Sequence, residues 1–425
     1  MNIKREDMRG AGLSKMEIRE FLENAVRGRQ LKKVLIIPPD FTRCHSGAGF
    51  ITNMYYHFLT EQDCQVDILI AQGTHDPISR EQFQKMYGDI PYEVMIPHRW
   101  REDTVSIGVV PGDYLSSITD GLWKEDLQVE VNRRVLDPSY DLILSVGQVV
   151  PHEVIGMANH AKNIFVGVGG QDMINKSHML GAVLGLENIM GKDHSPVRKA
   201  FDYALEHFLQ KIPLLFLLTV TTAPEGKILM HGIYMGDERK VLEDAIAKSQ
   251  EKNIIFLDRG IKKCVVYLDP EEFKSTWVGN KAVYRTRMAI EDGGELLVLA
   301  PGVNCFGEDP GNDQVIRTYG YCGREKVLEL FEKDELLQSH MGAAAHLIHG
   351  SSDGRFTITY AVEQISKEEI EKIHYQAIDY QDAAKKYDIS KLQNGWNQME
   401  DGEEIFFISN PALGLWIDKK RFEQR

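Results

Sequence analysis

Lys33-Val34-Leu35-Ile36-Ile37 runs directly into Pro38-Pro39-Asp40-Phe41-Thr42-Arg43, so a short aliphatic segment ends in a polar loop. Three more segments have a similar character, at residues 66–71, 140–145 and 163–166. Buried strands of an α/β sheet have this composition, because crossover helices cover both faces of the sheet. Apolar residues recur at helical spacing in 16–26, 53–61 and 196–209, which predicts helices there.

A second set of strands and helices begins near residue 254. Strands are predicted at 253–257, 263–267, 295–300, 356–360 and 404–408, and helices at 279–291 and 325–337. Gly293-Gly294 is a plausible stop for the first of these helices, and the polar stretch 247–252 is a linker or a helix end. The predicted fold is two α/β domains with mostly parallel sheets, residues 1–255 and 256–425, with an active-site cleft between them.

Composition narrows the class of protein. The 425 residues suit two domains, and the net charge of −14 disfavours a nucleic-acid partner. The five cysteines form no CxxC pair, which argues against a disulfide framework and suits a reducing compartment. We find no signal-peptide pattern at the start and no apolar stretch long enough to cross a membrane. A cytoplasmic protein without a membrane partner is expected.

Polar loops follow two predicted strands, at the place where open α/β sheets bind their ligands. After strand 33–37, Asp40, Thr42 and Arg43 offer a carboxylate, a hydroxyl and a guanidinium, and arginine suits bidentate capture of a carboxylate or phosphate. After strand 66–71, His75 is placed for proton transfer, since its unperturbed pKa lies near neutrality. Plainer explanations stay open: a turn with a capping aspartate and a solvated arginine, and a turn histidine without a chemical role.

A third segment, residues 147–178, concentrates groups that can carry chemistry: His152, His160, Lys162, His178 and the glycines 167, 169 and 170. Lys162 precedes the predicted strand 163–166 and is expected to be partly buried; a desolvated lysine amine is a better nucleophile. The glycines would let a backbone approach a phosphate, although their spacing is not GxGxxG. Taken singly, Lys162 can equally be a surface lysine at an edge, and His178 an ordinary residue at a helix start.

Taken together, these residues resemble the nickel-pincer-nucleotide lactate racemase family. Asp40-Phe41-Thr42-Arg43 is similar to that family's Asp-His-Thr-Arg motif, and Gly73-Thr74-His75 to its Gly-Thr-His. His152, Lys162 and His178 follow in the family's order of His, Lys and His, with gaps of ten and sixteen residues. Length and domain order also match, so the resemblance covers nearly the whole chain.

The resemblance implies a role for each of these residues. Lys162 would be joined through a thioamide to a nickel-pincer nucleotide, a pyridinium mononucleotide whose two sulfurs and one ring carbon hold Ni(II), and His178 would supply the fourth ligand. His75 and His152 would be the two general acid/base residues, one for each enantiomer. Asp40, Thr42 and Gly169 are assigned to cofactor binding, and Arg43 to the substrate.

In the second domain, the family's substrate lysine lies about twelve residues before a Gly-Gly pair, and Lys281 has this place relative to Gly293. Lys281 and Trp277 are therefore assigned to substrate binding. The chain departs from the family pattern at Val278, where glutamine is usual, and at Phe41 and Cys44-His45 in the first motif. These changes favour a longer or more apolar 2-hydroxy acid, or a sugar acid, over lactate itself.

The predicted activity is thus racemisation or epimerisation of a 2-hydroxy acid by reversible hydride transfer, with cofactor maturation enzymes as partners. Hydride transfer is expected because the proton on the carbinol carbon is barely acidic. Two other functions stay open. Lys162 can instead form a Schiff base with a carbonyl substrate or pyridoxal phosphate, or the protein can bind a nucleotide or metal without turnover.

Overall fold

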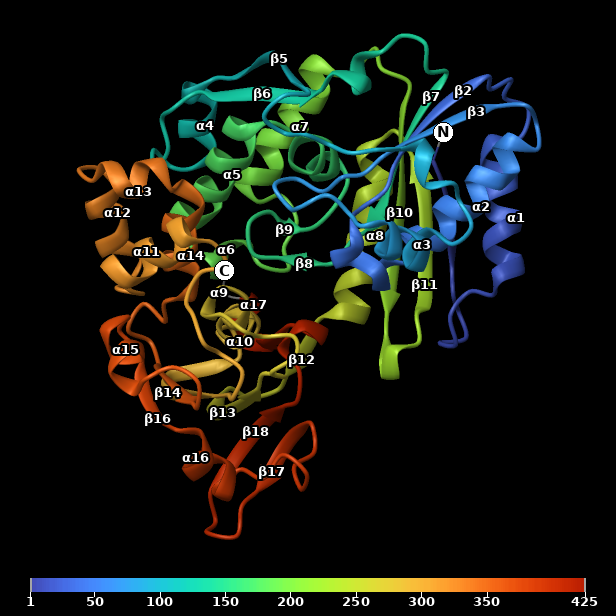
Figure 1. Ribbon diagram of the computed structural model, residues 1–425. Helices are drawn as coiled ribbons and strands as arrows, with labels where there is room; N and C mark the ends of the chain where they lie inside the picture. The colour runs from blue at the N-terminus through green and yellow to red at the C-terminus, as the bar shows by residue number, and fades with distance from the viewer. Residues whose placement is uncertain (1, 424–425) are drawn as a thin grey trace. The chain divides into compact units, whose positions relative to one another are not determined.

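The computed structural model describes residues 2–423, so residues 1 and 424–425, the outer ends of the two predicted domains, lie outside the described range. Contacts divide the chain into two compact units. Unit 1 is Met1–Ser177 with Met190–Asn253, and unit 2 is His178–Ile189 with Ile254–Arg425. The boundary predicted at 255/256 assumed two continuous segments, whereas unit 2 takes in the short segment His178–Ile189. Each unit is built on its own sheet with helices (Figure 1), which confirms two α/β domains with mostly parallel sheets.

Unit 1 contains a seven-stranded sheet. In spatial order its strands are β1 (Ile3–Glu6), β11 (Leu229–Gly236), β10 (Leu214–Thr222), β7 (Leu142–Gln148), β2 (Lys33–Ile37), β3 (Gln65–Leu69) and β4 (Met95–Ile96). The five strands from β10 to β4 are parallel, and β11 pairs antiparallel with both β10 and β1. Two small antiparallel pairs lie outside this sheet: β5 (Thr104–Val110) with β6 (Leu127–Asn132), and β8 (Pro151–His152) with β9 (Gly156–Met157).

Helices cover this sheet because its strands are apolar on both faces. The helices and turns of this part of the chain are α1 (Lys15–Val26), the 3₁₀ turn Phe41–Ser46, α2 (Ala48–Thr60), α3 (Arg80–Tyr87), the turn Tyr92–Val94, α4 (Gly112–Ile118), the turn Arg133–Leu136, the π-helix Asn163–Gly167, α5 (Gln171–Leu184), α7 (Pro196–Phe208), the turn Pro224–Gly226 and α8 (Arg239–Asn253). One face of the sheet, including Val34 and Ile36, packs on α1 and α2 in a single core. Phe216 of β10 faces the other way and stacks against His160.

The order of the strands places a switch point between β2 and β7. The chain goes from β2 to β3 on one side, and later returns to β7 on the other side of β2. Crossovers therefore leave in opposite directions at the carboxyl ends of these two strands. Open α/β sheets bind ligands in the crevice at such a point, so the loops after β2 and β7 are the first place to look for a site.

Unit 2 contains a six-stranded sheet with five parallel strands and one antiparallel edge strand, β17. In spatial order its strands are β16 (Gln376–Asp379), β15 (Thr357–Val362), β14 (Ile290–Ala300), β13 (Ile261–Tyr267), β18 (Glu404–Ile408) and β17 (Gly395–Gln398), and β12 (Ile255–Leu257) pairs separately with β19 (Trp416–Asp418). Its helices and turn are α6 (Leu186–Ile189), α9 (Thr276–Gly279), α10 (Lys281–Thr286), α11 (Pro310–Tyr319), α12 (Arg324–Phe331), α13 (Glu335–Ser339), α14 (Met341–Gly350), α15 (Lys367–Lys372), α16 (Tyr380–Lys386), the turn Pro411–Leu413 and α17 (Lys419–Glu423).

The structure corrects three local predictions. Residues 163–166, predicted as a strand, form a π-helix, because the Asn163 side chain bonds to strand ends and holds the segment outside the sheet. The helix predicted at 279–291 is two short helices, α9 and α10, and Gly293-Gly294 lies inside β14 at a register shift. The helix predicted at 325–337 is interrupted before Asp334, whose side chain caps α13. The stretch 247–252 is the end of α8.

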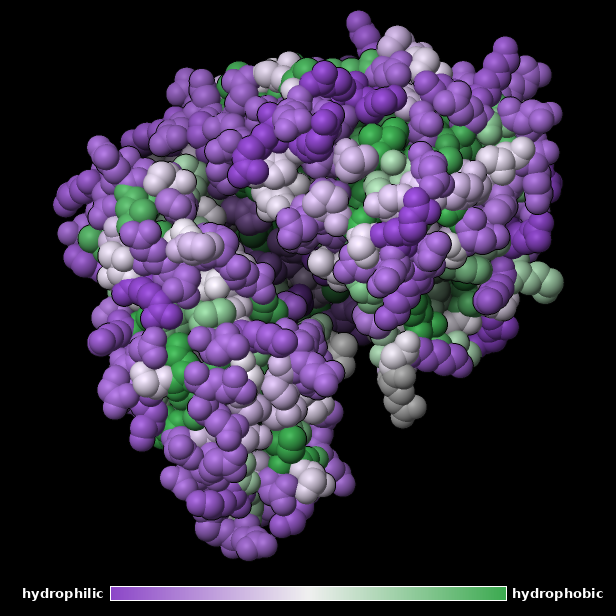
Figure 2. Space-filling model, viewed as in Figure 1, coloured by the Kyte–Doolittle hydropathy of each residue, from purple (hydrophilic) through white to green (hydrophobic). Residues whose placement is uncertain are grey.

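The surface that Figure 2 shows is mostly hydrophilic, in agreement with the 26% of charged residues in the sequence. Figure 2 shows mostly hydrophilic residues on the face in view, with hydrophobic residues in small patches. Within residues 2–423, no helix combines the length and the apolar character that a membrane-crossing segment requires.

Candidate functional site

Asn163 fixes the lysine-bearing segment at the switch point. Its side-chain amide donates to the carbonyl of Ile37, the last residue of β2, at 3.0 Å, and to the hydroxyl of Ser145 in β7 at 2.9 Å. One side chain thus joins the two strands between which the crossovers diverge. Lys162 is the residue immediately before it, so the structure places Lys162 at the carboxyl ends of the central strands.

The surroundings of Lys162 favour a neutral amine. Burial, followed by the positive charge of Arg43, lowers the pKa of Lys162 to about 8, although the carboxylates of Glu153 and Asp40 partly oppose the shift. These three groups come from two loops: Arg43 and Asp40 from the loop after β2, and Glu153 from the β8–β9 hairpin. Lys162 is partly buried, as predicted.

Asp40 organises the loop after β2. Its Oδ1 accepts the backbone N–H of Thr42 at 3.1 Å and the Thr42 hydroxyl at 2.5 Å, which caps the turn that carries Arg43. Burial raises the pKa of Asp40, but the hydrogen bond and charge of His75, with Thr42 and Arg43, outweigh it and hold the net pKa below its usual value. Asp40 is therefore a charged and largely buried carboxylate.

His75 is oriented by this carboxylate. Its Nδ1 lies 2.5 Å from Oδ2 of Asp40, and the imidazole is otherwise exposed. The loop that carries His75 is tied to the Lys162 segment, because the Gly73 N–H donates to the Gly167 carbonyl at 2.9 Å. Gly73 adopts a φ of +56°, which favours glycine. The structure thus brings together Asp40, Thr42, Arg43, His75 and Lys162.

His152 is buried in the β8–β9 hairpin. Its Nδ1 accepts the backbone N–H of Val154 at 3.1 Å, and the carboxylate of Glu153 lies 3.9 Å from the same nitrogen. A nitrogen that accepts a hydrogen bond carries no proton, so in the neutral ring the proton is on Nε2.

Gly169 has a packing role that explains its lack of a side chain. A Cβ there would meet the carbonyl oxygen of Phe165, and the Gly169 carbonyl accepts a hydrogen bond from Nε2 of the buried His98 at 2.9 Å. Its predicted contact with the cofactor stays a prediction.

His178, Trp277 and Lys281 belong to unit 2. His178 lies in α5. Trp277 stacks on His346 with ring centroids 4.1 Å apart, and its backbone N–H donates to the carbonyl of Phe306. The Lys281 amine lies over the ring of Phe273 at 5.6 Å. The roles assigned to these three residues also stay predictions.

The sequence reasoning gave no role to Asn163, Glu153 or Gln72. Gln72 lies in the loop between β3 and His75, is buried, and has an Oε1 atom without a hydrogen-bond partner among the described residues. Its Nε2 donates to the carbonyl of His75 at 3.2 Å, and an orphaned acceptor beside His75 fits a site that takes a polar ligand. The adjacency of Asn163 to Lys162 was the only signal in the sequence, and nothing in it showed that Asn163 spans two strands.

His346 and His349 lie on α14, and both are buried. His346 bonds to the hydroxyls of Tyr284 at 2.6 Å and Tyr321 at 3.0 Å. These contacts fix the ring on which Trp277 stacks.

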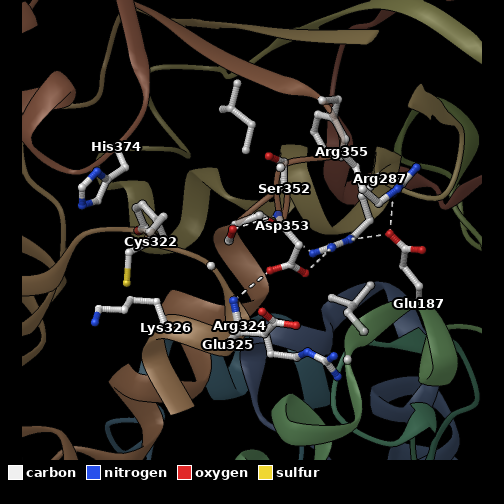
Figure 3. Close-up of a pocket in the computed structure, with 18 of the residues that line it drawn as sticks. Glu187, Arg287, Cys322, Arg324, Glu325, Lys326, Ser352, Asp353, Arg355 and His374 are labelled. Carbon is white, nitrogen blue, oxygen red and sulfur yellow. Dashed lines mark hydrogen bonds and ion pairs between the residues drawn. The ribbon is translucent and has the colours of Figure 1, made fainter. Parts of the chain in front are cut away.

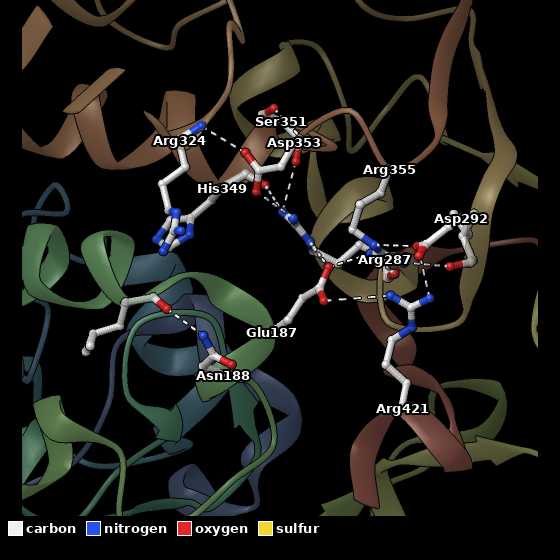
Figure 4. A network of polar contacts seen from close by, with 12 residues as sticks. Glu187, Asn188, Arg287, Asp292, Arg324, His349, Ser351, Asp353, Arg355 and Arg421 are labelled. Carbon is white, nitrogen blue, oxygen red and sulfur yellow. Dashed lines mark hydrogen bonds and ion pairs between the residues drawn. The ribbon is translucent and has the colours of Figure 1, made fainter. Parts of the chain in front are cut away.

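A cavity of about 980 Å³ in unit 2 lies beside the first residues of β15 and β16 (Figure 3). None of the predicted site residues lines it. Its wall is an ion-pair network in which the buried Glu187 bonds to Arg287 and Arg355, and Arg287 also bonds to Asp353 at 3.0 Å (Figure 4). These charges neutralise one another, so the network is best explained as part of the framework of unit 2.

The residues of unit 1 fit the implied cofactor. A depressed amine pKa suits covalent attachment through Lys162, and the loop after β2 adds the Thr42 hydroxyl and the Arg43 guanidinium. Among residues 2–423 there is no group of three or more His, Cys, Asp or Glu side chains arranged to hold a metal ion. That result concerns only sites built from side chains alone.

Comparison with known proteins shows what the chain is similar to. Residues 11–188 match the family model described as lactate racemase N-terminal domain. The fold is similar to a crystal structure from Thermotoga maritima, with a TM-score of 0.80 and 23% identity over 97% of this chain and 100% of that one. It is also similar to the lactate racemase apoprotein from Thermoanaerobacterium thermosaccharolyticum, with a TM-score of 0.70 and 16% identity over 96% and 94% of the two chains. None of the curated proteins matches.

Proposed function

We propose that the chain is a member of the lactate racemase-like family, on the premise that residues 11–188 match the lactate racemase N-terminal domain, and that it racemises or epimerises a 2-hydroxy acid. Family membership supports a racemase-type activity. The proposed mechanism rests on one observation: the Asp40–His75 pair and the Lys162 amine both lie at the switch point between β2 and β7.

We infer that Lys162 carries the nickel-pincer nucleotide and that His178 ligates its nickel. Asp40, Thr42 and Gly169 would hold the nucleotide. When bound, this group supplies a reversible hydride acceptor for the carbinol carbon of the substrate. For attachment the chain contributes the Lys162 amine, whose lowered pKa of about 8 leaves much of it neutral near that pH. This matters because only the neutral amine is nucleophilic.

The two histidines suit opposite proton transfers. Nδ1 of His75 donates to the Asp40 carboxylate, which leaves Nε2 with a lone pair that can take a hydroxyl proton. Nδ1 of His152 accepts a backbone N–H, so its Nε2 carries a proton that it can donate. One ring therefore begins as base and the other as acid, and their roles exchange when the opposite enantiomer reacts.

Substrate binding is assigned to charged and aromatic groups. Arg43 and Lys281 would bind the carboxylate, and Trp277 would form an apolar wall. The wall is fixed from behind by His346. A bulky aromatic surface favours a longer or more apolar 2-hydroxy acid, or a sugar acid, over lactate. The proposal further includes cytoplasmic maturation enzymes as partners and a cytoplasmic location.

The test uses protein matured in a host that has the maturation enzymes. Enantiopure 2-hydroxy acids and aldonic acids are screened, and the chirality of the product is measured. Inversion of at least one substrate is expected, His75→Ala and His152→Ala should keep nickel but lose activity, and Lys162→Ala should lose nickel. Racemisation at a near wild-type rate in His152→Ala would remove the two-base assignment.

Intact mass under denaturing conditions separates the two other functions. A thioamide-linked nucleotide stays attached, whereas a Schiff base at Lys162 is lost unless it is first reduced with borohydride. A carrier or sensor would retain nickel and the added mass without inverting any substrate of the screen.

A further inference from the structure

A second cavity, of about 540 Å³, lies in unit 1 where α7 leads into β10. It is lined by the start of β10, by residues just after β11 and by the end of α7, and none of the predicted site residues lines it. This place is at the amino end of β10, whereas Asp40 and His75 follow the carboxyl ends of their strands.

Four neighbouring side chains here have buried polar atoms without a hydrogen-bond partner among the described residues. These are both ring nitrogens of His160, Oδ1 of Asp202, Nη1 of Arg239 and Nη1 of Arg198. His160, Asp202 and Arg239 line the cavity, and Arg198 is electrostatically coupled to Asp202 and Arg239. His160 and Arg198 are each only 1% exposed.

Such a cluster is unstable unless something polar completes it. A buried polar group left unpaired destabilises the folded state, and most buried polar groups in native proteins are paired with protein or water. Buried water can serve some of these atoms, but the cavity is much larger than one water molecule and has an apolar wall at Leu205, Leu209 and Phe216. Apolar walls around a few convergent polar groups are typical of sites for small organic molecules.

The charges restrict which molecule fits. The lining holds two arginines, Arg29 and Arg239, against four carboxylates, one of them Asp202 and the other three at residues 206, 237 and 238. Arg239 is already paired with Asp202 at 3.1 Å and with Asp193 at 2.5 Å. A simple anion therefore meets a net negative lining, and a simple amine leaves Nη1 of Arg239 without an acceptor.

We propose that this cavity binds a zwitterionic amino acid with an aliphatic side chain. Its carboxylate would accept from Nη1 of Arg239, its ammonium would donate to Oδ1 of Asp202, and its side chain would lie on Leu205 and Leu209. Each of the two ligand charges then meets an unpartnered protein atom of opposite sign.

The site is connected to the segment that carries Lys162. His160 is two residues before Lys162, and its carbonyl accepts the N–H of Asn163 at 2.9 Å. Arg198 donates to the carbonyls of Met157 at 2.7 Å and Asn159 at 3.2 Å. A ligand bonded to Asp202 and Arg239 changes the charges that act on Arg198. Binding should therefore stiffen residues 157–163, and amide hydrogen exchange there should slow.

The experiment titrates the full chain with L-leucine, L-isoleucine, L-valine and L-methionine by calorimetry. The matched probes are 4-methylpentanoate, which lacks the ammonium, and 3-methylbutan-1-amine, which lacks the carboxylate. At least one amino acid should bind saturably, and each matched probe should bind at least about tenfold more weakly than leucine. Absence of saturable binding of all four up to about 10 mM would overturn the proposal, as would equal binding of the probes that lack one charge.

Variants locate the binding. Arg239→Gln should abolish it, but this change enters a buried charge cluster and the protein can fail to fold. Leu205→Trp fills the half-buried rim and leaves the charges in place, so it should weaken binding at least about tenfold with an unchanged unfolding temperature, while Leu205→Met stays within about threefold. Binding that is the same in Leu205→Trp and wild type would place the ligand elsewhere and end the proposal.

Discussion

Nδ1 of His75 lies 2.5 Å from Oδ2 of Asp40, and the other oxygen of the same carboxylate caps the turn that carries Arg43. One buried carboxylate thus orients a base and shapes the loop beside Lys162. Since the carboxylate accepts from Nδ1, the pairing with Asp40 selects the tautomer of the neutral ring in which Nε2 has a lone pair.

Asp40→Asn should lower kcat of the matured enzyme about 10²-fold, because an amide does not hold His75 in the reactive tautomer. Asp89→Asn is a matched control, since Asp89 pairs with His57 at 2.9 Å on the surface of the same unit. Rates in both directions are measured together with nickel content. A kcat within threefold of wild type at full nickel content would contradict the role given to Asp40.

Lys162 in the unloaded protein should react with acylating reagents along a pH curve that has its midpoint near 8, the value to which burial and Arg43 lower its pKa. The reactive form is the neutral amine, so the rate rises as the pH passes upward through this value. Lys240 is the internal control, because its hydrogen bond to Asp244 raises its pKa. Peptide mass spectrometry measures both lysines in one sample, and equal midpoints would refute the description of the Lys162 pocket.

Asn163→Ala should lower the free energy of unfolding by about 1–3 kcal/mol, because the buried Ile37 carbonyl and Ser145 hydroxyl lose their donor. Ser145→Ala removes only one of these bonds and should cost less. Urea unfolding measures both variants. If the two changes cost the same, the bond to Ile37 contributes nothing and Asn163 does not join the strands energetically.

Glu187→Gln should destabilise the protein by about 3–5 kcal/mol, because it leaves Arg287 and Arg355 without their buried partner. Asp292 belongs to the same network but its side chain is 71% exposed, so Asp292→Asn should cost less than about 1 kcal/mol. Thermal and urea unfolding give the comparison. A small effect at Glu187 would mean that water already reaches this ion pair.

Three central strands of unit 1 (β2, β3 and β7) and four strands of the sheet in unit 2 (β13, β14, β15 and β18) could be predicted, because their aliphatic runs are bounded by turn residues. Asp40 and His75 could be placed after strand ends for the same reason, whereas Lys162 was expected before a strand at 163–166 that is a π-helix. The π-helix at Asn163 could not be predicted, because Ile164, Phe165 and Val166 are as apolar as a buried strand, and only the tertiary bonds of Asn163 exclude them from the sheet. The pairing of Asp40 with His75 spans 35 residues and depends on the adjacency of β2 and β3, which local patterns do not determine.

The segment His178–Ile189 belongs to unit 2 although unit 1 residues flank it in the sequence, and this matters when unit 1 is to be produced separately. A stop codon after Asn253 would retain this insert and delete the polypeptide with which it packs. Met179, Leu180, Leu186 and Ile189, all at most 2% exposed in the intact protein, would lose their cover. Such a truncated product should aggregate on expression, and a soluble version requires excision of the insert and a designed linker in its place.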